Sequence, residues 1–152
     1  EGKVSPDHVV AMARELAKAG PCEIALADTI GVAVPAQVQD LITRVAAITG
    51  NIPLRAHFHN TRNTGIANAW AAYQAGVTTL DSSLGGLGGC PFAPNATGNI
   101  PTEDLVYLLE RSGVSTGLDL DRLIETGHWL TQIMNRPLSA MVTRAGNYSG
   151  TS

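Results

Sequence analysis

Two histidines separated by one residue, His57 and His59, are the side chains of this sequence best suited to hold a metal ion. They follow an apolar stretch, 52–56 (IPLRA), that predicts a short buried strand. Because side chains alternate along a strand, both imidazoles are expected on one side, close enough to share an ion. Two histidines that only line a polar cleft are the alternative. His8 and His128 fall on expected helices and are interpreted as surface or interface residues.

Imidazole nitrogens combined with oxygen donors suit a divalent cation. An oxygen-rich remainder of the ligand set favours Mg²⁺ or Mn²⁺ over a structural zinc ion. Only two nitrogen ligands are visible in the sequence, so carboxylate or amide oxygens must complete the site.

A glycine-dense stretch, 85–91 (GGLGGCP), carries a single thiol, Cys90. A loop cysteine is reactive when its neighbours lower its pKa, whereas a small apolar filler is the alternative. The stretch is not a phosphate-binding loop, since no Gly-Lys-Ser/Thr follows it, and it does not match a dinucleotide-binding fingerprint. The other cysteine, Cys22, begins an apolar stretch and is expected to be buried and inert.

Asp28 and Thr29 end a second apolar stretch, 22–27 (CEIALA). A carboxylate at that place could bind substrate, orient a ligand or cap the following turn. Asn95 and Asn99 lie in a glycine- and proline-containing segment, where turn chemistry alone can explain both.

The composition restricts the class of protein. A length of 152 residues, 44% of them apolar and 15% charged, fits one domain with a substantial core. The net charge of −3 predicts neither nucleic acid nor an anionic membrane as a partner. No apolar run approaches the roughly 20 residues of a membrane span, and residues 1–3 do not resemble a signal peptide. Two cysteines favour free thiols in a reducing compartment.

The positions of apolar residues, prolines and glycines predict alternating helices and strands. Helices are expected at about 6–19, 35–49, 64–74, 101–109 and 121–135, strands at 22–27, 54–58 and 77–83, and an irregular segment after Pro137. This alternation indicates a parallel sheet with right-handed crossovers. Asp28, His57, His59 and Cys90 fall at or after the carboxyl ends of these strands, where α/β folds carry their chemistry.

Taken together, the stretches 27–31 (ADTIG), 57–61 (HFHNT), 86–91 (GLGGCP) and 98–99 (GN) resemble the 3-hydroxy-3-methylglutaryl-CoA lyase family. That family belongs to the metal-dependent lyase and synthase group of TIM barrels, and the resemblance runs from residue 1 to about residue 135. It implies an α/β fold that forms the C-terminal part of a (β/α)₈ barrel, roughly strands 6–8 with their helices, plus C-terminal helices.

The resemblance also implies roles for individual residues. Metal ligands would be His57, His59 and Asn99; catalytic residues would be Cys90, which acts in proton transfer, and His57; substrate-binding residues would be Asp28 and Thr29. The implied cofactor is a divalent metal, Mg²⁺ or Mn²⁺, and the implied partner is an acyl-CoA substrate.

The implied reaction is cleavage of a carbon–carbon bond in a 3-hydroxy-acyl-CoA, with 3-hydroxy-3-methylglutaryl-CoA giving acetyl-CoA and acetoacetate. Such a lyase serves leucine catabolism and ketone-body formation, in a bacterial cytoplasm or a mitochondrial matrix. A Claisen-type synthase or aldolase of the same barrel group is one alternative, which the cysteine loop disfavours. A non-catalytic metal-binding fragment is another, because the family's Arg-Asp pair occurs nowhere in the 152 residues.

We expect one partial barrel domain over 1–152, with core βα units to about 113, a helical extension at about 118–136 and an irregular tail at 137–152. A half barrel exposes unpaired strand edges. It is therefore expected to form a homo-oligomer or to pair with a missing N-terminal half of the barrel. The stretch 60–63 (NTRN) replaces the Asp-Thr found after the histidines in many members, which leaves the exact substrate open.

Overall fold

A three-stranded parallel sheet, in the order β1-β2-β3, is the centre of the computed structural model, which describes residues 3–89 and 98–148. The elements are α1 (Pro6–Ala17), β1 (Ile24–Asp28), α2 (Pro35–Thr49), β2 (Leu54–Phe58), α3 (Gly65–Gln74), β3 (Thr79–Asp81), the short 3₁₀-helix η1 (Leu84–Gly86), α4 (Thr102–Arg111), α5 (Leu120–Met134) and α6 (Met141–Ala145). Strands and helices alternate up to α4. This confirms the expected α/β class with parallel strands.

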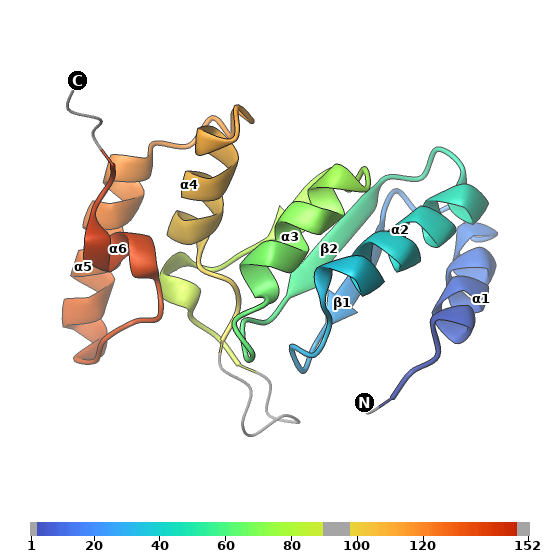
Figure 1. Ribbon diagram of the computed structural model, residues 1–152, viewed down its shortest axis with the longest axis horizontal. Coiled ribbons are helices and arrows are strands. Elements are labelled where there is room, and N and C mark those ends of the chain that lie inside the picture. Colours follow the sequence, from blue (N-terminus) through green and yellow to red (C-terminus); the bar gives the residue numbers. More distant parts are fainter. Residues whose placement is uncertain (1–2, 90–97, 149–152) are drawn as a thin grey trace.

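Among the described residues, the helices that cover the sheet lie on one of its faces (Figure 1). Figure 1 shows α1, α2 and α3 packed along one side of the strands, while α4, α5 and α6 form a separate group at the other end of the molecule. The central strand β2 alternates accordingly, with Leu54, Ala56 and Phe58 buried beneath the helices. Arg55 and His57 are half-buried on the opposite face. The sequence pattern of β2 thus fixes which side chains face the helices and which face the uncovered side.

The predicted bounds of β2 and α2 are confirmed, but those of the two outer strands differ. β1 begins two residues later than expected, and β3 is limited to three residues. Cys22, expected to be buried, is exposed because it precedes the first paired residue of β1, Ile24. β3 is short because its pairing with β2 is confined to the three residues opposite Arg55–His57.

The segment after Pro137, expected to be irregular, contains the short helix α6. Its first turn is capped by Asp104 of α4, whose carboxylate accepts hydrogen bonds from the backbone N–H of Met141 (3.1 Å) and Val142 (2.7 Å). A cap 37 residues away in the sequence leaves no local signal. The prediction failed for that reason.

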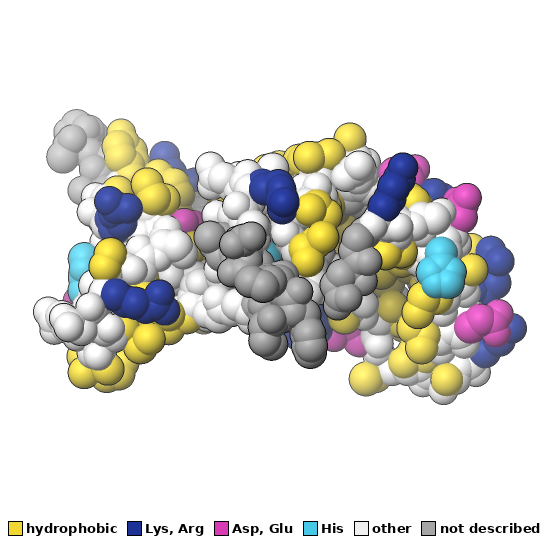
Figure 2. Space-filling view, turned by 90° about the horizontal axis from the view of Figure 1, so that it is seen from below, with side chains coloured by type: hydrophobic (Ala, Val, Ile, Leu, Met, Phe, Trp, Pro, Cys, Tyr) yellow, Lys and Arg dark blue, Asp and Glu magenta, His cyan; other side chains and the backbone are white. Residues whose placement is uncertain are grey.

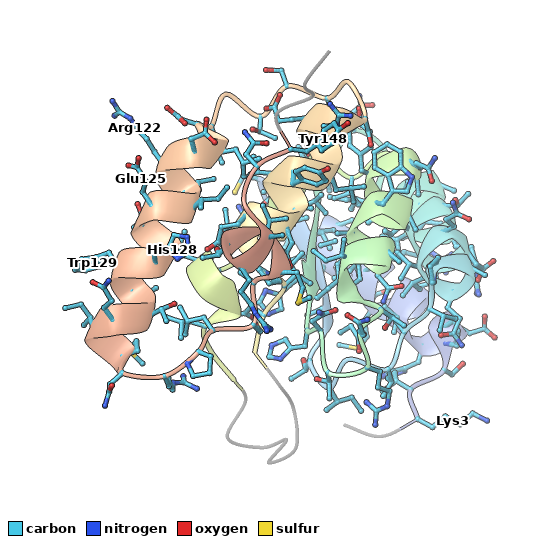
Figure 3. All side chains as sticks on the ribbon, turned by 60° about the vertical axis from the view of Figure 1, so that its left-hand side comes forward. Lys3, Arg122, Glu125, His128, Trp129 and Tyr148 are labelled. Atoms are coloured by element: carbon cyan, nitrogen blue, oxygen red, sulfur yellow. The ribbon has the colours of Figure 1, made fainter. Side chains whose placement is uncertain are left out.

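The outer face of α5 points away from the rest of the chain. Figure 3 shows Arg122, Glu125 and Trp129 directed outward from this helix. His128 is exposed on the same helix, as is His8 on α1, which agrees with their interpretation as surface residues.

A buried carboxylate joins the C-terminal helices to η1. Glu103 of α4 is fully buried, and both of its oxygens accept the backbone N–H of Gly85, at 3.0 and 2.9 Å. The hydroxyl of Thr143 in α6 donates to the same carboxylate at 2.9 Å. There is no room for a side chain at Gly127 of α5, where a Cβ would lie 2.7 Å from Glu103 Oε1. Glu103 therefore holds Gly85, which begins the glycine-dense stretch, while Thr143 of α6 donates to the carboxylate and Gly127 of α5 packs against it.

Replacing Glu103 by Ala should lower the free energy of unfolding by about 2–4 kcal/mol, because the Gly85 N–H and the Thr143 hydroxyl lose their buried acceptor. The neighbouring change Asp104→Ala removes the α6 cap and one carboxylate from the first turn of α4, and should cost about 1 kcal/mol. Urea unfolding followed by circular dichroism measures both values. Equal losses in the two variants would contradict the role assigned to Glu103.

Candidate active site

The two histidines lie side by side at the carboxyl end of β2. His57 is the fourth residue of the strand, and His59 follows the strand's last residue by one position. Their ring centroids are 5.3 Å apart, with an angle of 55° between the ring planes. His59 is buried, with 5% exposure, whereas the His57 side chain is 31% exposed. The prediction that the pair shares one side is confirmed.

A backbone pairing brings Asn99 to this pair. Residues 98–100 run antiparallel to the chain that leaves β2, with a bridge between His59 and Asn99. The N–H of Ile100 donates to the Phe58 carbonyl at 3.3 Å, and the N–H of Asn60 donates to the Gly98 carbonyl at 3.2 Å. Asn99 is thereby placed next to His59, although 40 residues separate them in the sequence.

The amide group of Asn99 has a defined orientation. Its Nδ2 donates to the backbone carbonyl of Leu87 at 2.8 Å. Because the NH₂ group is directed to Leu87, the amide oxygen is the atom of this side chain that can serve as a metal ligand.

Gly88 and Gly98, one on each side of the cysteine-containing segment, are required by close contacts. A Cβ on Gly98 would lie 2.0 Å from the carbonyl oxygen of Gly86 and 2.6 Å from that of Gly88. A Cβ on Gly88, which has φ +111°, would lie 2.5 Å from Asn99 Nδ2. The two described flanks of the cysteine-containing segment therefore touch each other and the Asn99 side chain. Cys90 itself lies outside the described residues.

A chain of polar side chains lies on the uncovered face of the sheet and ends at His57. Arg55 donates to Glu23 (2.5 Å) and to Asp81 (2.7 Å). The second oxygen of Asp81 lies 3.3 Å from His57 Nδ1. The hydroxyl of Thr79 donates to Glu23 at 2.9 Å. Glu23, Arg55 and Asp81 were not predicted as site residues. For Asp81 the sequence carries no local signal, because only the register of β2 against β3 places it opposite His57.

These contacts shift the protonation of the charged groups. Hydrogen bonds from Arg55 and then from Thr79 hold the pKa of Glu23 below its ordinary value. Hydrogen bonds to Glu23 and then to Asp81 raise the pKa of Arg55. Glu23 and Arg55 thus both favour their charged forms.

Asp28 is engaged in the turn after β1. Its two carboxylate oxygens accept hydrogen bonds from the backbone N–H of Val32 (3.0 Å) and Ala33 (2.9 Å). Of the three roles that its position allowed, capping of the following turn is the one these contacts display. Thr29 lies at the start of that turn. Substrate binding by Asp28 and Thr29 stays a prediction.

Arg62, from the stretch that departs from the family pattern, joins two loops at the same edge. Its guanidinium donates to the backbone carbonyls of Ile30 (3.1 Å) and Gly31 (3.0 Å). The loop after β2 is thereby fixed to the loop after β1. Figure 2 shows the face of the molecule seen from below. Apolar, basic and acidic side chains are interspersed over the described part of that face (Figure 2).

The donor set fits a hard divalent ion. Two imidazoles and one amide oxygen can be supplied by His57, His59 and Asn99, and this mixture suits Mg²⁺ or Mn²⁺. Within residues 3–89 and 98–148 there is no cluster of three or more His, Cys, Asp or Glu side chains arranged to hold a metal. The candidate centre therefore depends on the Asn99 oxygen as its third donor.

Comparison with known proteins agrees with this fold. The family model described as HMGL-like matches residues 1–130. The chain therefore belongs to the HMGL-like family.

Its similarity to individual proteins is high but covers only part of them. It is 50% identical to an (R)-citramalyl-CoA lyase of Chloroflexus aurantiacus, over 96% of this chain and 46% of that protein. It is 45% identical to the mitochondrial hydroxymethylglutaryl-CoA lyase of Mus musculus, over 95% of this chain and 45% of that protein. The chain thus spans about half the length of the curated relatives it matches.

A solved structure supports the fold directly. The structure of an HMG-CoA lyase from Acinetobacter baumannii in complex with coenzyme A and 3-methylmalate superposes with a TM-score of 0.92 at 41% identity, covering 100% of this chain and 50% of that one. The expected fold, part of a barrel of this family, is confirmed. No helix in the described ranges is both long and apolar enough to cross a membrane.

The change Gly98→Ala should destabilise the protein by about 3 kcal/mol, because the added Cβ would overlap two carbonyl oxygens. Gly89→Ala is the matched control: apart from its chain neighbours, no heavy atom of the described residues lies within 4 Å of its Cβ position, so its effect should stay within about 0.5 kcal/mol. Thermal unfolding measures stability, and the ¹⁵N–¹H signal of the Asn99 side-chain amide reports the local geometry. A Gly98→Ala protein with parental stability and an unshifted Asn99 signal would refute the close crossing.

Proposed function

We propose that this chain is part of a carbon–carbon lyase that cleaves a 3-hydroxy-acyl-CoA with the help of Mg²⁺ or Mn²⁺. The observation that carries the proposal is the convergence of His57, His59 and Asn99 at one edge of the sheet, against the glycines that flank Cys90. Membership in the HMGL-like family and high identity to two acyl-CoA lyases support the reaction class. The relative bound to coenzyme A supports an acyl-CoA substrate.

In this proposal His57, His59 and Asn99 hold the divalent ion. When bound, the ion supplies Lewis acidity that lowers the pKa of a substrate hydroxyl and stabilises negative charge on oxygen. The buried position of His59 and the hydrogen bond from Asn99 to Leu87 keep two of these ligands fixed before substrate arrives. Fixed donors avoid reorganisation during the reaction.

Cys90 is assigned the proton transfer. As the substrate loses its hydroxyl proton to a base, the C2–C3 bond breaks, and the electron pair passes to the acetyl-CoA enolate. The Cys90 thiol then donates its proton to the enolate carbon. Gly88, two residues before Cys90, lies against the Asn99 side chain, which supports a place for this thiol beside the metal ligands.

Two substrates fit the proposal. 3-Hydroxy-3-methylglutaryl-CoA would give acetyl-CoA and acetoacetate, whereas citramalyl-CoA, one methylene shorter, would give acetyl-CoA and pyruvate. The 50% identity to a citramalyl-CoA lyase favours testing the second substrate alongside the first.

The complete protein to which this chain belongs should release acetyl-CoA from one of these thioesters when Mn²⁺ or Mg²⁺ is present. A difference of one methylene should produce a preference of roughly 10- to 200-fold in kcat/KM. Enzymatic detection of acetoacetate and pyruvate distinguishes the products. Removal of the metal with EDTA should stop cleavage, and added Mn²⁺ should restore it. Cleavage of neither substrate with Mn²⁺ present would contradict the proposed function.

The variant Cys90→Ser should lower kcat by about 10²- to 10⁴-fold, because a serine hydroxyl is a far weaker proton donor than the thiol. Binding of Mn²⁺ should stay at the parental level, since Cys90 is not assigned as a ligand. Cys22→Ser, at an exposed cysteine outside the sheet, is the matched control and should leave kcat unchanged. Full activity of Cys90→Ser would show that the proton comes from another group.

A further inference from the structure

The polar side chains on the uncovered face of the sheet have no part in the proposed function, although they lead directly to a candidate metal ligand. We infer that Asp81 is a positioning residue, which orients His57 so that Nε2 faces the ion, and that Arg55, tethered by Glu23, holds Asp81 in place. The inference rests on the proposed metal site.

The contact with Asp81 selects one tautomer of His57. Neutral imidazole has one nitrogen that donates and one that accepts. A carboxylate that also receives a hydrogen bond from Arg55 acts as an acceptor, so His57 Nδ1 donates to Asp81 Oδ2 across 3.3 Å. The lone pair is then on Nε2, the nitrogen remote from Asp81. Histidines that bind metals usually donate their other ring N–H to a carboxylate or carbonyl in this way.

The carboxylate of Asp81 is held in one orientation. One of its oxygens accepts from Arg55 Nη1 at 2.7 Å, and the other lies against His57. With both oxygens engaged, the carboxylate cannot rotate without losing a contact. The sheet register places Asp81 directly opposite His57 and places Thr79 opposite Arg55, so all four side chains share one face.

Arg55 is itself held by two carboxylates. Its Nε donates to Glu23 at 2.5 Å while Nη1 donates to Asp81, so the planar guanidinium is held at two points. The hydroxyl of Thr79 fixes the other oxygen of Glu23. A lysine could not make both contacts with this geometry. These contacts link Glu23, which precedes β1, and Asp81 of β3 to the ring of His57.

Two measurements on the complete protein test the inference. Long-range ¹H–¹⁵N spectra of ¹⁵N-histidine protein without metal report the tautomer of His57, and electron paramagnetic resonance titration reports Mn²⁺ affinity. We expect the Nδ1–H tautomer in the parent. In Asp81→Asn, the amide can donate to Nδ1, so the population should move toward the Nε2–H tautomer, and Mn²⁺ affinity should fall about 10- to 100-fold. Arg55→Met should lower affinity less, by about tenfold or below.

Arg44→Met is the matched control. Arg44 also bridges two carboxylates, Asp7 and Asp40, but it lies on α2 away from the histidines. It should change neither the His57 tautomer nor the Mn²⁺ affinity. If Asp81→Asn does not fold, as judged by circular dichroism, Arg55→Met and the parental tautomer decide the question.

Either of two results would overturn the inference: an Nε2–H tautomer in the metal-free parent, or parental affinity and tautomer in the Asp81 and Arg55 variants. Failure of the proposed function is separable from both. If the parent does not bind Mn²⁺, the proposed metal site fails, and the tautomer of His57 in the parent and in Asp81→Asn alone decides whether Asp81 orients the ring.

Discussion

The antiparallel pairing of residues 98–100 with the chain leaving β2 is the contact on which the candidate site depends. It sets Asn99 beside His59 and brings the glycine flanks of residues 90–97 against each other. The pairing requires glycine at position 98, because two carbonyl oxygens occupy the space of a side chain. One short stretch of backbone hydrogen bonds thus places a third donor, the amide oxygen of Asn99, beside the two imidazoles.

Two further parts of the structure contribute to the candidate site from different sides. The buried Glu103 carboxylate of α4, which also accepts a hydrogen bond from Thr143 of α6, holds the N–H of Gly85 and fixes the start of the glycine-dense stretch. On the uncovered face of the sheet, Arg55 and Asp81 lead to His57. The candidate ligands therefore lie at the end of β2, just after it, and on one paired loop, with their supports on separate elements. Such separation is typical of sites whose ligands must be fixed before a substrate binds.

The sequence predicted the parallel strands and the histidine pair because both follow from local patterns: apolar runs ended by glycine, and the two-residue period of a strand. It could not predict the position of Asp81 opposite His57, since this depends on sheet register, nor the α6 helix, whose cap comes from Asp104 in another helix. Only the family resemblance indicated Asn99 as a metal ligand, because turn chemistry explained its presence equally well. Cys22 was wrongly predicted to be buried, because an apolar run in the sequence does not mark the first paired residue of a strand.

The central claim is that two imidazole nitrogens bind one divalent ion at this edge of the sheet. Electron spin-echo measurements on the complete protein, loaded with Mn²⁺ and labelled with ¹⁵N-histidine, count these nitrogens directly. We expect couplings between Mn²⁺ and two histidine nitrogens in the parent, and between Mn²⁺ and one histidine nitrogen in His57→Ala. Bound Mn²⁺ without histidine couplings, or with couplings that His57→Ala leaves unchanged, would contradict it.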